Sequence, residues 1–183
     1  AQAESQARLA VTGLEAMDRY WSLRADAWLL LIRALRSADP ARAAQEADAF
    51  VRWVSAPEAP EGLPLVALVQ AEQAAGDPRD PSAAYRHYEE AMTKADALGI
   101  PSAIAEVAQS YGSFLIARGD LQRASTIIGK TAGWAAGDYG CAVLQAQLYQ
   151  ALGDEGEALR EARAWAVDLA GERPLPAALR EPA

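Results

Sequence analysis

Apolar residues recur along this chain three or four positions apart, which is the spacing of amphipathic helices. Ile104, Val107, Tyr111 and Leu115, for example, fall on one helical face. The apolar–polar alternation typical of strands is not sustained anywhere in the sequence, so we expect an all-α fold. The pattern predicts helices over residues 3–18, 21–38, 40–54, 62–75, 81–98, 101–118, 121–135, 139–152 and 155–170.

Two helix starts carry residues that cap the first backbone amides. The pairs Asp39-Pro40 and Asp80-Pro81 place a carboxylate directly before a proline. The carboxylate accepts backbone N–H groups that lack a partner, and proline suits the first helical position because it has no N–H. These local signals agree with the helices predicted from periodicity.

A turn recurs after 34 residues near the C-terminal end of the chain. Gly119-Asp120 and Gly153-Asp154 each stand between two apolar helical stretches. A recurrence of this length, with a turn at a fixed place, is typical of stacked helical hairpins. Glu157 follows Asp154 by three residues, which predicts a capping box at the start of the next helix.

With this turn and the small residues around it, the chain resembles the tetratricopeptide repeat family. That consensus has a small residue within the first helix of each hairpin, a Gly-Asp type of turn, and alanine with a large residue in the second helix. The first hairpin departs from it, because Leu31 stands where the small residue should be. The likeness spans residues 24–170 and is closest toward the C-terminal end. The matching residues are Gly112, Gly119, Asp120 and Ala124; Ala146, Tyr149, Gly153, Asp154 and Ala158; Ala84, Tyr88 and Ala91; and Ala43.

The resemblance implies a right-handed superhelix of about four antiparallel helix hairpins. Gly112 and Ala146 would lie where the two helices of a hairpin cross, since a larger side chain would push them apart. We expect one domain over residues 1–183, with an extra helix at 1–20 and a tail at 171–183 that folds back over the last helix. The extra helix also suggests that the chain is the C-terminal part of a longer protein. The expected hairpins span residues 21–54, 62–98, 101–135 and 138–170.

In this family the first helix of each hairpin lines a concave groove that takes an extended peptide or a partner helix. The lysines and asparagines with which the best-known members hold a terminal carboxylate are not found at the matching positions here. Glutamines stand there instead. Their amides both donate and accept hydrogen bonds and would suit an uncharged segment, although a solvated face would tolerate glutamine equally well. The groove residues implied are Trp28, Ile32, Val66, Gln70, Gln73, Gln109, Ser113, Ile116, Val143, Gln147 and Gln150.

Charge and composition limit the partners. The formal net charge of −8, without any run of lysine and arginine, argues against nucleic acid. The longest apolar run, residues 27–32, is far shorter than the roughly 20 residues that span a bilayer, so we expect no membrane insertion. Alanine occupies 44 positions, and its small side chain favours helices that approach closely.

Residues with chemical reactivity are sparse. His87 is the single histidine in the sequence, and no cysteine or set of carboxylates accompanies it at the spacing of a metal site or catalytic pair. Cys141 is the single cysteine, which excludes an internal disulfide, and we expect it to pack as a small apolar residue. We therefore expect no enzymatic activity, no cofactor and no bound metal.

These observations favour a protein–protein interaction module, a scaffold that binds a protein segment or another copy of itself, within a larger bacterial regulatory protein. One alternative is a ligand-sensing domain that controls an attached effector. Another is an extracytoplasmic assembly factor, since the sequence begins Ala-Gln-Ala without methionine, as a processed protein would. An enclosed apolar pocket would favour the sensor and an open groove the interaction module. We expect a cytoplasmic location, or a periplasmic one if the N-terminus is processed.

Overall fold

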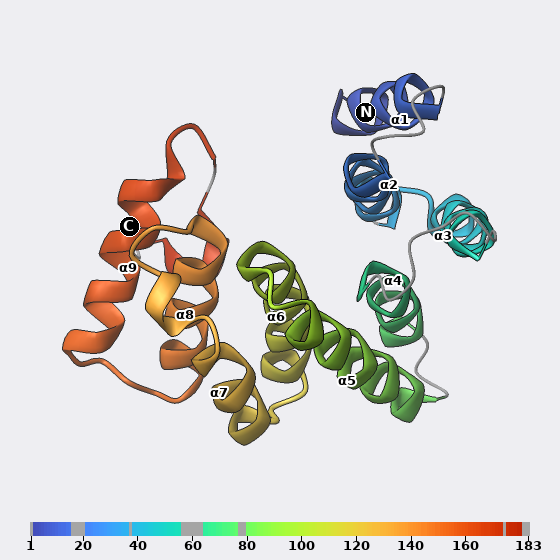
Figure 1. Ribbon diagram of the computed structural model, residues 1–183. Coiled ribbons are helices and arrows are strands. Elements are labelled where there is room, and N and C mark those ends of the chain that lie inside the picture. The colour runs from blue at the N-terminus through green and yellow to red at the C-terminus, as the bar shows by residue number, and fades with distance from the viewer. Residues whose placement is uncertain are drawn as a thin grey trace. The chain divides into compact units, whose positions relative to one another are not determined.

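The computed structural model of the chain describes residues 2–15, 21–36, 38–55, 64–76, 80–173 and 175–180 (Figure 1). This described part is helical and contains no strand, which confirms the all-α prediction. The ends of the helices predicted at 3–18 and 62–75 fall partly outside it. Its elements are α1 (Gln2–Glu15), α2 (Trp21–Arg36), α3 (Pro40–Val54), α4 (Pro64–Ala75), α5 (Pro81–Leu98), α6 (Pro101–Ala117), α7 (Leu121–Gly129), α8 (Tyr139–Ala151) and α9 (Glu157–Ala170), with 3₁₀ turns η1 (Ala132–Trp134) and η2 (Ala177–Leu179).

Carboxylates cap several helices as predicted. Asp39 accepts the backbone N–H of Arg42 at 3.1 Å, and Asp80 accepts that of Ala83 at 3.2 Å. The prolines that follow them are the first residues of α3 and α5. The local chemistry of these two starts therefore fixes where the helices begin.

The capping box predicted at Asp154 and Glu157 is wrong. Asp154 accepts the backbone N–H of Gly156 at 2.6 Å, two residues along, instead of an amide three residues along. This short loop holds the chain outside the helix until Glu157, which is the first residue of α9. The acidic residue at the N-terminus of α9 still lies where the helix dipole favours negative charge.

The helix predicted over 121–135 ends early, at Gly129. The hydroxyl and the backbone N–H of Thr131 both donate to the carbonyl of Ile128, each at 3.0 Å. That carbonyl would otherwise accept the N–H of Ala132 in a continued α-helix. The chain turns there and forms η1.

The described contacts divide the chain into two compact units, residues 1–94 (unit 1) and 95–183 (unit 2), with the division inside α5. The single domain expected from the sequence stays a prediction.

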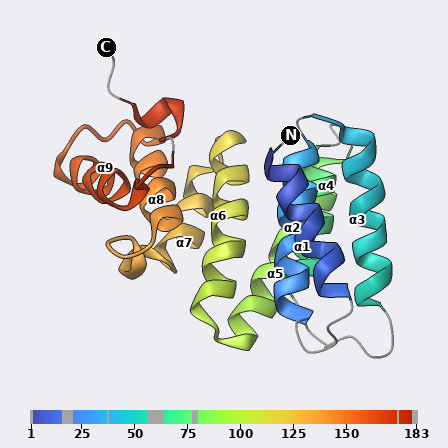
Figure 2. The same ribbon diagram turned by 90° about the horizontal axis from the view of Figure 1, so that it is seen from above.

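Polar and aromatic contacts link the helices of unit 1. α2 packs against α1 and α3, and α4 packs against α2 and α3 (Figure 2). The buried carboxylate of Glu72 on α4 accepts Nη2 of Arg33 at 2.6 Å and lies 2.8 Å from Nη2 of Arg36, both on α2. Trp28 of α2 donates its indole N–H to Glu46 of α3 at 3.2 Å. These contacts join α2 to each of its two later neighbours.

Close backbone approach characterises unit 2. α6 packs against α7 and α8, and α8 packs against α9. A Cβ atom on Gly112 of α6 would lie 3.0 Å from Cγ1 of Ile128 on α7 and 3.1 Å from Cδ2 of Leu144 on α8. The glycine thus lies at the predicted helix crossing and lets both neighbours close in. Ala146 of α8 is likewise fully buried.

The two turns of the recurrence have the same geometry. Gly119 and Gly153 both have φ of +73°. The N–H of Asp120 donates to the carbonyl of Leu115, and that of Asp154 to the carbonyl of Tyr149, five residues back in each case. This pairing is the Schellman motif, whose left-handed residue is most easily glycine. Gly76 has no positive φ, so its turn differs.

The tail returns to the last hairpin, as the sequence predicts. Leu179 of η2 is buried in a cluster with Ala146 of α8 and with Leu159 and Ala162 of α9. Arg173 also stacks over the ring of Tyr139 at 4.3 Å. The tail therefore covers apolar surface at the end of the chain.

Candidate binding surface on α6 and α8

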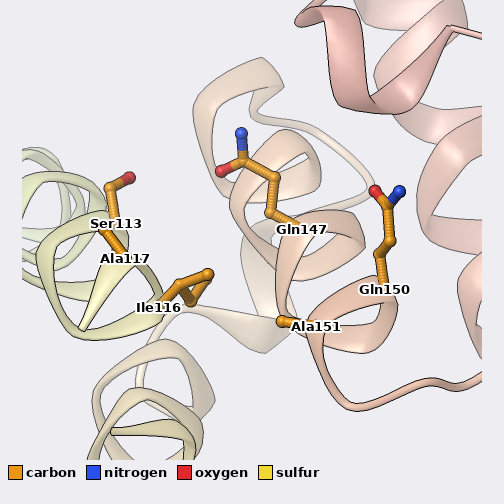
Figure 3. Close-up of a pocket in the computed structure, with 6 residues that line it drawn as sticks. All are labelled: Ser113, Ile116, Ala117, Gln147, Gln150 and Ala151. Atoms are coloured by element: carbon orange, nitrogen blue, oxygen red, sulfur yellow. The ribbon is translucent and has the colours of Figure 1, made fainter. Parts of the chain in front are cut away.

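An open pocket of about 410 Å³ lies between α6 and α8 (Figure 3). Three predicted groove residues line it: Ser113 of α6, and Gln147 and Gln150 of α8. Ile116, also expected on this face, lines it as well. The structure therefore brings four of the residues expected in the groove, from two helices, to one opening.

The pocket has an apolar side and a polar side. Ile116 lies between the two helices near Ala151, while the amide ends of Gln147 and Gln150 extend away from this apolar part (Figure 3). Ser113 presents its hydroxyl from α6. No described lining residue is charged. The surface can therefore hydrogen-bond a polar backbone while its apolar part takes a neutral side chain.

Sequence reasoning did not assign two of the lining residues, Ala117 and Ala151. Each ends its helix, and both are exposed. Alanine occurs so often in this chain that its identity alone carries no signal. Their helical positions were the usable clue, because Ala151 follows Gln147 by four residues and so lies on the same face.

Gln109 has a structural role rather than a place at the pocket. Its amide nitrogen donates to Asp138 at 3.3 Å, and Asp138 accepts the backbone N–H of Cys141 at 2.8 Å. A side chain on Gly140 would overlap Gln109, so the glycine leaves the space that this amide fills. Gln109 thus ties α6 to the cap of α8.

Val143 of α8 is half-buried and packs against the cluster that contains Leu179. It lies on the part of α8 covered near the tail and does not line the pocket. This placement separates it from Gln147 and Gln150.

In unit 1 the predicted aromatic end of the groove is buried. Trp28 is 8% exposed and packs edge-on against Phe50, with ring centroids 5.8 Å apart. Ile32 is 1% exposed. The assignment of both residues to an accessible groove is therefore corrected, because α1, α3 and α4 surround α2. The exposed strip of α2 carries Leu23 and Leu30 instead.

The three predicted residues of α4 are all half-buried. Gln73 reaches toward α3, where its amide nitrogen lies 3.5 Å from the carbonyl of Ala44. Val66 and Gln70 keep part of their surface in solvent.

Reactive groups in the described residues are dispersed. The pKa of Cys141 is raised to about 11, mainly by burial and further by the hydrogen bond to Asp138 and the negative charge of Asp138. The thiol is therefore neutral. His87 lies 3.9 Å from the Glu90 carboxylate on the surface of α5. The described side chains form no group of three His, Cys, Asp or Glu that could hold a metal ion. Within the described part, no helix has the length and apolar content that crossing a membrane requires.

No protein-family model matches the chain, and no match was found among curated proteins or among solved structures. The pocket on α6 and α8 must therefore be interpreted from its own chemistry.

Proposed function

We propose that the chain is a tetratricopeptide-like interaction module that binds an uncharged protein segment across α6 and α8. The observation that carries this proposal is the open pocket, into which two helices contribute Ser113, Gln147 and Gln150. Their positions follow the groove register of that repeat family.

The packing of unit 2 supports the repeat architecture. α6 and α8 are the first helices of the two hairpins that share the Gly-Asp turn, and they contact one another directly. Gly112 of α6 allows that contact because it has no side chain that would collide with Ile128 of α7 or Leu144 of α8. In unit 1, α1 packs against α2 as the second helix of a preceding hairpin would.

The shape of the pocket supports a chain segment as ligand. A small molecule is usually held in a cavity that covers most of its surface, whereas this pocket is open. An extended backbone offers alternating N–H and C=O groups, and glutamine can pair with either. The uncharged lining favours neither acidic nor basic segments. We therefore expect selection for neutral residues around one apolar side chain.

Selection from a displayed library of short random peptides would test the proposal. Peptides that bind the wild-type chain should lose roughly tenfold or more in affinity for Gln147→Arg and Ser113→Arg, because a long cation fills the pocket. Gln122→Arg makes the same charge change on the exposed face of α7 and should leave affinity unchanged. Fluorescence anisotropy with each selected peptide measures the affinities of the wild type and the three variants.

Equal binding to all four proteins would place the peptide elsewhere and reject the proposed site. Failure of the library to yield any peptide that distinguishes Gln147→Arg from Gln122→Arg would also reject it. Circular dichroism at matched concentration shows whether each variant keeps its helix content.

A further inference from the structure

α6 and α8 run in the same direction and contact one another at successive levels along their length. Gln109 of α6 reaches Asp138 at the start of α8, and further along Gly112 of α6 lies against Leu144 of α8. The pocket comes next, between the C-terminal ends of both helices. The two contacts and the pocket therefore follow one another along the same pair of helices.

In these contacts, each helix offers the bare backbone of a glycine to a side chain of the other. A Cβ atom on Gly112 of α6 would lie 3.1 Å from Cδ2 of Leu144 on α8. In the opposite direction, a Cβ atom on Gly140 of α8 would overlap the amide of Gln109 on α6. The leucine side chain and the glutamine amide are thus two spacers, each packed directly on the backbone of the facing helix.

The two spacers together determine how far apart the helices lie at the pocket, because the separation of two rods at two levels fixes it at a third. Ile116 lies between the helices in the pocket (Figure 3). At a rise of 1.5 Å per residue, Gln109 precedes Gly112 by about 4.5 Å along α6, and Ile116 follows it by about 6 Å. A shift at the level of Gln109 therefore reaches the pocket at a similar size and in the opposite direction.

A hydrogen bond to the cap of α8 keeps the Gln109 amide in place. Oδ1 of Asp138 accepts the amide nitrogen of Gln109 at 3.3 Å and the backbone N–H of Cys141 at 2.8 Å. One oxygen thus joins a side chain of α6 to the first turn of α8. Glutamine has several rotatable bonds, and this interaction selects one of its conformations. The side chain can therefore serve as a spacer of defined length.

We propose that Gln109 is a positioning residue for the pocket, which sets the separation of α6 and α8 at Ile116 and so the size of the side chain that the pocket accepts. This inference rests on the function proposed for the pocket. Without the amide, the N-terminal parts of the helices approach, their C-terminal ends turn apart about Leu144, and the pocket widens. A wider pocket favours a bulkier apolar side chain, since a misfit of one methylene costs roughly tenfold in affinity.

Methyl NMR of the full chain tests the geometry without any ligand. The NOE between the methyl groups of Ile116 and Ala151 falls steeply with their distance, so it should weaken severalfold in Gln109→Ala. Gln122→Ala makes the same change on the exposed face of α7 and should leave the NOE at its wild-type intensity. Adding Gly140→Ala to Gln109→Ala places a methyl group in the vacated space and should restore the NOE.

The conservative variant Asp138→Asn separates the position of Gln109 from the charge of its partner. The asparagine keeps an Oδ1 atom that can accept both hydrogen bonds, so the NOE between Ile116 and Ala151 should keep its wild-type intensity. A weakened NOE in this variant would mean that the negative charge governs the helix separation, and would overturn the role given to Gln109.

The peptides selected on the wild-type chain provide the test of specificity. Each is prepared with valine and with phenylalanine at its apolar position, and fluorescence anisotropy measures both affinities. The ratio of the two affinities should shift toward phenylalanine by about tenfold in Gln109→Ala and return to the wild-type value when Gly140→Ala is added. A variant that is only less stable would weaken the binding of both peptides alike and leave the ratio unchanged.

The outcomes separate this inference from the proposed function. An NOE of unchanged intensity in Gln109→Ala would overturn the inference. A weakened NOE with an unchanged affinity ratio would also overturn it, because the width of the pocket would not decide which side chain fits. Absence of any peptide sensitive to Gln147→Arg would reject the proposed function instead, and the NOE would still decide whether Gln109 sets the width of the pocket.

Discussion

Units 1 and 2 join their helices by different means. In the repeat register expected from the sequence, Leu31 of α2 corresponds to Gly112 of α6, and both are buried. Around Gly112, side chains of α7 and α8 reach the backbone of α6. In unit 1, the paired arginines on Glu72 and the indole of Trp28 span from α2 to its neighbours. The unit with glycine at the compared position thus has close backbone packing, and the unit with leucine there has side-chain bridges.

The difference lies in the size of the residue at the compared position. A leucine at the crossing occupies volume that a glycine leaves free, so neighbouring helices must be held at a greater distance or a different angle. Long polar and aromatic side chains can cover that extra distance. In unit 1 the carboxylate of Glu72 is shared by two guanidinium groups.

The largest effect should come from filling the close contact of unit 2. Gly112→Leu would force apart Ile128 and Leu144, and overpacking of this kind should lower the free energy of unfolding by about 3 kcal/mol or more. Urea denaturation measures the loss. Gly129→Ala is the control, since a Cβ there meets nothing within 4 Å. A cost below that of Gly129→Ala would show that the crossing has room to spare.

The reverse change tests whether Leu31 merely replaces a missing small residue. Leu31 is 1% exposed, so Leu31→Ala should leave a cavity and lower the free energy of unfolding by about 3 kcal/mol. Leu30→Ala, at an exposed neighbouring position, should cost much less. Urea denaturation measures the free energy of unfolding of both variants. An unchanged value for Leu31→Ala would mean that the helices around α2 can move closer to its backbone, as those around α6 do.

Removing the shared carboxylate tests the polar bridge of unit 1. Glu72→Gln leaves two guanidinium groups beside a neutral amide, and we expect a loss of about 2 kcal/mol. The loss stays below that of a fully buried pair because Arg33 and Arg36 keep 32% and 40% of their side-chain surface exposed. Thermal unfolding measures it, with Asp48→Asn on the exposed face of α3 as the control. Identical thermal unfolding midpoints for the two variants would show that the contacts of Glu72 with the two arginines do not stabilise unit 1.

Raising the pH tests how far water is excluded from the Cys141 thiol between the helices of unit 2. The pKa of Cys141 is raised to about 11, so the folded state favours the neutral thiol. Stability is full below the unfolded pKa near 9.0 and falls as pH rises toward 11, by about 1–2 kcal/mol. Urea denaturation across this range measures the slope. Cys141→Ala should remove the part of this pH dependence that comes from the thiol. An unchanged pH dependence of the free energy of unfolding would contradict the role given to Cys141.

The smallest effects should be equal in the two recurring turns. Gly119→Ala and Gly153→Ala each place a side chain at φ +73° without a clash, so each should cost about 1 kcal/mol from backbone strain alone. Thermal unfolding compares the pair. Costs that differ severalfold would show that the turns are equivalent in shape only.

The sequence predicted the features that depend on residues close together along the chain. Asp39 and Asp80 cap their helices, and Gly119 and Gly153 close theirs, because each of these interactions spans a few positions. Ser113 was assigned to the groove through the register of the repeat family, and it lines the pocket on α6.

What the sequence did not predict depends on distant contacts. Trp28 and Ile32 were assigned to the groove, but the side of α2 that stays accessible is set by three other helices. Gln109 was assigned there too. Its engagement with Asp138 depends on the bare backbone of Gly140, which belongs to a helix that starts 38 residues after the start of α6.

The placement of the five tryptophans gives each unit its own optical signature. Trp21 and Trp53 stack at 4.4 Å with rings only 8° from parallel, and Trp28 lies beside Trp53 in unit 1. In unit 2, Trp134 and Trp165 pack against the cluster that contains Cys141. Parallel indoles couple their electronic transitions and a thiol quenches indole emission. Circular dichroism can therefore follow unit 1 through its coupled indoles without any added label.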